Sequence, residues 1–142
     1  MNAEEKTAHC TAVTGAALAL GTLLPVALFQ TGVLRRLPDP PGSIFDSAWI
    51  TSSKDAHPFG IPDALLGLGS YGVTMALLLA APECGLARKA LAVKLAGDSS
   101  MAAVNVVKQF VKFRRICSWC TGTAIATGVM VAAGRRYLKA RS

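Results

Sequence analysis

Long apolar stretches separated by short polar segments dominate the chain. Four of them are long enough to cross a hydrocarbon core roughly 30 Å thick, at about 1.5 Å of helix rise per residue. They cover residues 11–34, 61–82, 90–111 and 116–134. The polar segment after the first stretch contains several prolines and then Ser43–Ser53, which is compatible with a short helix. The pattern predicts an all-α fold in a single domain, an integral membrane four-helix bundle with a short interfacial helix in its first loop.

The third stretch is the weakest candidate span because Lys94, Asp98 and Asn105 interrupt it. An ionisable residue inside a span costs roughly 2.5–3.5 kcal/mol on insertion scales, and such residues generally face the interior of a bundle. Lys94 and Asp98 are four residues apart, a spacing that brings both side chains to one face of a helix. The sequence therefore allows an ion pair at this position.

Composition and charge support a surface that faces lipid. Hydrophobic residues make up 52% of the chain and charged residues only 16%, whereas soluble proteins contain about 25% charged residues. The net charge is +7, but the basic residues cluster at the ends of the apolar stretches, where they can meet phospholipid headgroups. Aromatic residues make up 6% and do not alternate with basic ones, so no nucleic-acid partner is expected.

The amino-terminal residues differ from a signal peptide. The segment MNAEEKTAHC carries Glu4, Glu5 and Lys6 ahead of the first apolar stretch, whereas a signal peptide has a basic start and a shorter apolar core. We therefore expect the first stretch to be retained as a span. Lys and Arg are divided almost equally between the two faces of a four-span bundle, so the positive-inside rule does not orient it.

The four cysteines fall into two pairs on opposite faces of the predicted bundle. Cys10 and Cys84 lie at span ends on one face, while Cys117 and Cys120 open the last span on the other. A disulfide requires Cα atoms within about 7 Å, whereas the two faces are about 30 Å apart. The two pairs cannot exchange within one chain. Cys10 and Cys84 are expected to be inert thiols unless their face is oxidising.

The motif Cys117-Ser118-Trp119-Cys120 allows three interpretations. As a redox dithiol, its first thiol would gain acidity from the helix amino terminus and from Arg114 and Arg115. As a metal site, it supplies only two of the usual four ligands, with His57 the nearest further candidate unless two chains share the metal. As a structural pair, the cysteines are small apolar residues of a membrane helix. The position at a span mouth beside two arginines favours the redox interpretation.

A run of glycine, proline and polar residues, 52–71, leads into the second stretch. Gly67 and Gly69 would let another helix approach closely. Asp63 is either a charge that caps the helix start or a polar contact for a ligand held between helices. His57 is interpreted as an ordinary loop residue. The run suggests the entrance of a pocket.

The segment HPFGIPDALLGLGSYG, residues 57–72, precedes a weak third span and a fourth span opened by RRICSWC. This order resembles the vitamin K epoxide reductase family, in a bacterial-type form, over about residues 11–135. The resemblance implies a four-helix membrane bundle around a quinone. It also implies that Cys117 and Cys120 are the catalytic pair, which reduces a quinone or quinone epoxide and is itself reduced by thiols.

The same resemblance suggests the residues that contact the quinone. Asp63 falls where many members place Asn or another group near a quinone oxygen, and Ser53 matches a loop serine common in the family. Tyr71, in the same run, and Trp119, between the cysteines, complete the expected substrate-binding set. The expected ligand is a quinone, as substrate or bound molecule, and no metal is expected.

Two departures from the family pattern affect the expected function. Members with the full electron relay carry two cysteines in the first loop, but this chain has none between Cys10 and Cys84, and Ser47 stands where the second would be. Ala124 occupies a place where several members have a tyrosine. The internal relay is therefore absent, and electrons would have to come from a separate thiol protein.

Two hypotheses follow for the function. The first is an enzyme, a membrane thiol–quinone oxidoreductase whose partners are the lipid bilayer, a quinone and a thioredoxin-like thiol protein. Cys117, nearer the aqueous edge, would exchange with that protein. The alternative is a degenerate, non-catalytic membrane protein that binds a quinone or another protein. In either case we expect a multi-pass protein of the bacterial cytoplasmic membrane.

Overall fold

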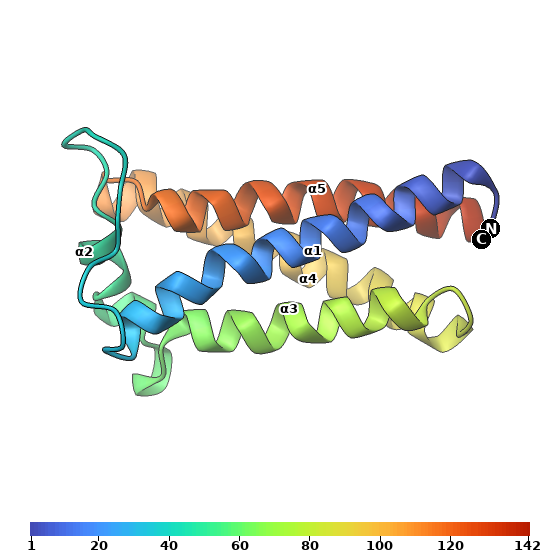
Figure 1. Cartoon of the computed structure of the whole chain (residues 1–142), viewed down its shortest axis with the longest axis horizontal. Coiled ribbons are helices and arrows are strands. Elements are labelled where there is room, and N and C mark those ends of the chain that lie inside the picture. Colours follow the sequence, from blue (N-terminus) through green and yellow to red (C-terminus); the bar gives the residue numbers. More distant parts are fainter.

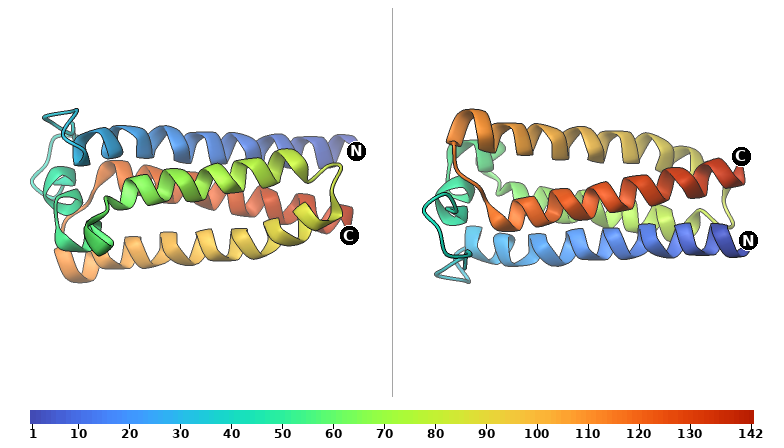
Figure 2. Two further views of the ribbon diagram at one scale, coloured as in Figure 1. Left: turned by 90° about the horizontal axis from the view of Figure 1, so that it is seen from below. Right: turned by 90° about the horizontal axis from the view of Figure 1, so that it is seen from above.

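The computed structural model describes residues 1–142 and shows an antiparallel bundle of four long helices (Figures 1 and 2). The helices are α1 (Ala3–Gln30), α3 (Asp63–Ala80), α4 (Gly85–Lys108) and α5 (Ser118–Arg141). One π-helical turn, Gln109–Phe113, extends α4 toward the start of α5. The structure contains no β-strand beyond one isolated bridge. The all-α prediction is confirmed.

The first loop closes one end of the bundle, opposite the end where both termini lie (Figure 1). It contains the short helix α2 (Ser47–Thr51) and two 3-10 turns, Lys54–Ala56 and Pro58–Gly60. A short helix was predicted within Ser43–Ser53, and α2 lies there. Its location at a membrane interface stays a prediction.

Two helices extend beyond the predicted spans for local reasons. α1 begins at Ala3 because the Asn2 side chain accepts a hydrogen bond from the Glu5 N–H at 2.8 Å, which caps the helix start. α5 continues past residue 134 because Tyr137 is fully buried in the bundle, although the two arginines before it are exposed. The helices are therefore longer than their apolar cores, and the depth at which each enters lipid stays a prediction.

Three helices are long and apolar enough to cross a membrane: Ala3–Gln30, Asp63–Ala80 and Gly85–Phe113. The fourth, α5, is less apolar because it ends in basic residues and also carries threonines on its inner face, of which Thr123 and Thr127 are buried. Their hydroxyls donate to carbonyl oxygens of Trp119 and Thr123 within the same helix. A polar inner face of this kind is satisfied inside the bundle, which allows α5 to lie among the apolar helices.

The core between α1 and α5 depends on small residues. Ala12, Ala16 and Ala19 of α1 are fully buried, and they pack in one cluster with Met130 and Tyr137 of α5. A Cβ atom on the buried Gly15 would lie 2.8 Å from the Met130 backbone nitrogen. The two helix backbones are therefore in direct contact here, a packing mode that only glycine permits.

We predict that Gly15→Ala destabilises the bundle by about 1–3 kcal/mol, the usual cost of overpacking. The added methyl group would meet backbone atoms, which cannot move aside without separating α1 from α5. Gly21→Ala is the matched control, since it is on the same helix and a Cβ there meets nothing within 4 Å. Thermal unfolding in detergent should give a lower midpoint for Gly15→Ala alone. Equal midpoints for the two variants would contradict the close approach.

Candidate functional site

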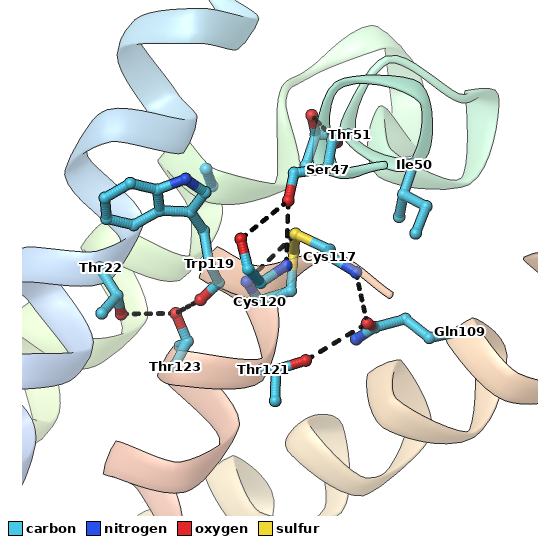
Figure 3. Close-up of a disulfide and its surroundings, with 12 residues drawn as sticks. Thr22, Ser47, Ile50, Thr51, Gln109, Cys117, Trp119, Cys120, Thr121 and Thr123 are labelled. Carbon is cyan, nitrogen blue, oxygen red and sulfur yellow. Dashed lines mark hydrogen bonds between the residues drawn. A yellow bond between two sulfur atoms is a disulfide. The ribbon is translucent and has the colours of Figure 1, made fainter. Parts of the chain in front are cut away.

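The CxxC motif lies at the start of α5, at the end of the bundle that the first loop closes. Cys117 and Cys120 form a disulfide, with their Cα atoms 5.2 Å apart (Figure 3). Cys10 and Cys84 are free, exposed thiols near the opposite end. The predicted division of the cysteines into two pairs, and the CxxC pair at a helix mouth, agree with this arrangement.

Side chains satisfy the N–H groups at the start of α5. The Cys117 N–H donates to Gln109 Oε1 at 2.8 Å, and the Ser118 N–H donates to Ser47 Oγ at 3.0 Å. The Cys120 N–H points to Cys117 Sγ at 3.1 Å. A helix start leaves such groups without intrahelical partners. Here α2 and the π-turn after α4 reach in from two sides to supply them (Figure 3).

A carboxylate from the first loop joins this network. Asp39 accepts hydrogen bonds from the Ser47 N–H at 2.9 Å and from Ser118 Oγ at 2.6 Å, and it also accepts the Ser47 hydroxyl. Partial burial raises the pKa of Asp39, but the hydrogen bonds from Ser118 and Ser47 together outweigh it, so the pKa lies below its ordinary value. Asp39 is therefore an anionic clamp between the loop and the CxxC motif.

The loop is also held by backbone pairing to the residue before the motif. The Ile116 N–H donates to the Ile44 carbonyl at 2.7 Å, and the Asp46 N–H donates to the Ile116 carbonyl at 3.0 Å. Arg115 donates to the Ser43 carbonyl at 2.9 Å, so this arginine holds the loop. Cys117, predicted at the aqueous edge, lies at the loop end of the bundle but has no exposed surface, because the loop covers it.

Cys120 faces a different environment, a cavity of about 350 Å³ between the helices. Its walls include apolar side chains such as Leu23, Val26 and Leu66, together with a small number of polar ones. The polar groups are Asp55, Asp63, Ser70, Tyr71, Asn105, Lys108 and Thr123. Wider grooves lie on the bundle surface, but none of them contains either cysteine of the pair. An apolar cavity with a few polar groups is typical of a small-molecule site.

Two of the predicted substrate-binding residues line this cavity. Asp63 accepts a hydrogen bond from Gln30 Nε2 at 2.9 Å and makes no cap for α3. The Tyr71 hydroxyl lies 2.5 Å from Thr127 Oγ1. A Cβ atom on Gly67 would lie 3.0 Å from the end of the Leu23 side chain of α1, whereas one on Gly69 would meet nothing within 4 Å. The close approach of another helix backbone stays a prediction for both glycines.

The other two predicted residues lie elsewhere. Ser53 lines a smaller cavity of about 60 Å³ that also contains Cys120, and its hydroxyl donates to the Ile50 carbonyl at 2.7 Å. Trp119 lines neither cavity. Its Nε1 donates to the Pro38 carbonyl at 2.8 Å, and its ring packs beside the α1 side of the bundle (Figure 3). This position favours a role in holding the loop, and contact of Trp119 with a quinone stays a prediction.

Several residues that the structure brings to the site were not identified as site residues from the sequence. Gln30 and Asp39 bond to residues 33 and 79 positions away, so no local pattern identifies them. Gln109 is only eight residues from Cys117, but its contact depends on the change of direction between α4 and α5. Asn105 and Lys108 do have a signal, since they lie three apart in the weakest span and both line the cavities at Cys120. Their spacing on one helix face could have added both residues to the predicted site.

A metal centre is not assembled by these residues. No group of three or more His, Cys, Asp or Glu side chains comes together. His57, the further ligand considered with the CxxC pair, has its Nδ1 3.0 Å from the Ser53 carbonyl. A metal held by the CxxC pairs of two chains stays a hypothesis.

Comparison with known proteins agrees with the geometry. No curated protein and no solved structure matches the chain. The sequence profile of the vitamin K epoxide reductase family matches residues 7–133, which include the loop, the cavity walls and the CxxC motif. The chain therefore belongs to the vitamin K epoxide reductase family.

Proposed function

We propose that the protein is a membrane thiol–quinone oxidoreductase in which the Cys117–Cys120 pair exchanges electrons with a quinone. The observation that carries this proposal is the unequal environment of the two sulfurs. Cys120 lines an apolar cavity between four helices, whereas Cys117 is buried beneath a polar loop. One cysteine thus adjoins a site suited to a lipid-soluble ring, and the other adjoins the aqueous side.

The first step of the proposed reaction, between the dithiol and the quinone, needs no further reactant. In the reduced enzyme, the two thiols lose two electrons and two protons as the sulfur–sulfur bond forms. The quinone takes up both electrons and both protons to become a quinol. An external dithiol then returns the pair to its reduced state by thiol–disulfide exchange, and becomes a disulfide itself.

The cavity offers groups that stabilise the reduced quinone. Lys108 lines both cavities beside Cys120, and its ammonium group makes no ion pair. A cation aimed at the site where negative charge develops lowers the barrier to electron transfer into the ring. Asn105, one turn away, supplies an amide that can donate to the same oxygen. Asp63 is the polar contact proposed from the resemblance, and it lines the same cavity from α3.

Electrons have to enter at Cys117 from outside the chain. Ser47 reaches the start of α5 with its hydroxyl, but a hydroxyl cannot form the mixed disulfide through which a relay cysteine would pass electrons. We propose a thioredoxin-like protein as the donor. It can reach Cys117 only when the loop opens, because the sulfur is covered in the closed structure.

The central test uses reduced protein in detergent with Cys10→Ser and Cys84→Ser as background. A short-chain quinone should re-oxidise the Cys117–Cys120 dithiol and yield one quinol per protein, as measured by thiol alkylation and quinone absorbance. The background changes should have no effect, since both thiols lie at the far end of the bundle. Cys117→Ser or Cys120→Ser should each abolish quinol formation.

Persistence of both thiols in the presence of excess quinone would contradict the proposed activity. If the double Cys117→Ser, Cys120→Ser variant also kept full biological function, the protein would act by binding alone. The absence of a thiol in the first loop and Ala124 in the cavity wall are the observations that favour this second candidate.

We also predict that Asp39→Asn opens the loop. The change removes the charge from three hydrogen bonds, and bonds to charged groups contribute about 1.5–3 kcal/mol each. A total loss of about 1.4 kcal/mol is already a factor of ten, so Cys117 should be exposed at least about tenfold more often. The readout is the rate at which an impermeant maleimide modifies Cys117 as the only cysteine. Glu83→Gln, an exposed carboxylate at the other end, is the control.

The pH dependence of this effect follows from the direction of the pKa shift. The folded protein holds the pKa of Asp39 below its ordinary 3.8, so the clamp is fully present above that value and is lost only as the pH falls through the lowered one. The ratio of variant to wild-type rates should therefore be constant between about pH 5 and 8. A ratio that changes across this range would contradict the assignment of the clamp to Asp39.

A further inference from the structure

A charged cluster joins α3 to α4 beside the cavity, and Ser70 lies between the cavity and the surface groove that Lys94 and Asp98 line. Lys94 Nζ lies 2.5 Å from Asp98 Oδ1, as the spacing of the two residues allowed. The Asp98 side chain is only 5% exposed, and its second oxygen accepts from Thr74 Oγ1 at 2.6 Å. Ser70 completes the cluster, because its Oγ accepts from Lys94 Nζ at 2.7 Å.

The cost of this cluster suggests that it does more than join two helices. Both charges lie on α4 within a segment long and apolar enough to span a membrane, and removing two ions from water is rarely repaid by their mutual attraction. Ionisable groups in such segments are commonly functional. A purely structural contact between α3 and α4 could be made by apolar side chains at lower cost.

The Ser70 hydroxyl hydrogen is the uncommitted donor in the cluster. Its only acceptor is Asp98 Oδ1 at 3.4 Å, which is beyond the normal range for O–H···O bonds. Lys94 already occupies that oxygen at 2.5 Å. Ser70 lines the cavity, so a small rotation of its hydroxyl directs the hydrogen to a ligand there.

The other hydroxyls that line the cavity are already committed. Thr127 Oγ1 donates to the Thr123 carbonyl at 2.7 Å, so the Tyr71 hydroxyl must donate in its bond to Thr127. The Thr123 hydroxyl has acceptors in Thr22 Oγ1 at 2.6 Å and the Trp119 carbonyl at 3.0 Å. Ser70 alone has a hydrogen without a good partner, and it is next to a cation.

We propose that Ser70 donates a hydrogen bond to the quinone oxygen farther from Cys120, and that Lys94, fixed by Asp98, is the positioning residue that polarises this bond. This inference rests on the proposed function. Ser70 lies two turns along α3 from Asp63, so the ring would lie between Cys120 at the loop end and Ser70 deeper in the bundle. As the dithiol passes two electrons and two protons to the quinone, the polarised hydroxyl stabilises the negative charge that develops on the far oxygen.

The test compares the two half-reactions of Ser70→Ala with those of the wild type. Quinone reduction by the reduced dithiol should slow about tenfold to one hundredfold, the range expected for loss of a hydrogen bond to a charged group. Reduction of the disulfide by a small external dithiol should be unchanged, because that step occurs at the loop end. Ser100→Ala, which removes an exposed hydroxyl from α4 away from the cavity, is the matched control and should leave both rates unchanged.

Conservative variants separate the proposed role from a structural one. Ser70→Thr keeps the hydroxyl and should retain the rate of the quinone step. Lys94→Gln removes the charge and should slow this step, whereas Lys94→Arg keeps the charge and should leave it near the wild-type rate. In the double variant Ser70→Ala, Lys94→Gln the two losses should not add, because Lys94 acts through Ser70. A rate constant for the quinone step in Ser70→Ala equal to that of the wild type would overturn this inference alone. A wild-type protein that does not reduce quinone would overturn the proposed function, and this inference with it.

Discussion

The backbone N–H groups at the start of α5 are the constraint on which the site depends. They need acceptors because no earlier helical turn provides them, and a buried N–H without a partner costs about 1–3 kcal/mol. Gln109 and Ser47 provide acceptors from two segments that are distant from each other in sequence. Satisfying one helix start therefore draws the π-turn after α4 and the first loop to the CxxC motif.

The same constraint gives the two sulfur atoms of the disulfide different surroundings. The loop that supplies Ser47 also covers Cys117, while the opposite side of the motif opens to the cavity through Cys120. Access to Cys117 thus depends on local opening of hydrogen bonds, whereas access to Cys120 depends on entry between helices. Local opening requires much less free energy than unfolding of the bundle, so one sulfur can be uncovered while the cavity walls stay in place.

The sequence predicted those features whose cause is local. The apolar stretches marked the helices, and the i,i+4 spacing identified the Lys94–Asp98 pair that the structure contains. It did not predict how far the helices extend, because capping by Asn2 and burial of Tyr137 lengthen them outside the apolar stretches. Asp39 and the two glutamines were missed for another reason. Asp39 and Gln30 act on residues 79 and 33 positions away, and Gln109 acts across the turn between α4 and α5, so no local pattern encodes their roles.

Position 47 bears directly on the proposed route of electrons. The resemblance to the family implies a cysteine there in members with an internal relay. Here the serine hydroxyl keeps the contact with the start of α5 and with Asp39, but it has no sulfur to form a disulfide. In the proposed function, position 47 thus holds the loop in place and does not carry electrons. Under the same proposal, the chain keeps the quinone side of the chemistry and takes electrons from a separate thiol on the other side. The strength of the Asp39 clamp then limits how often that thiol can reach Cys117.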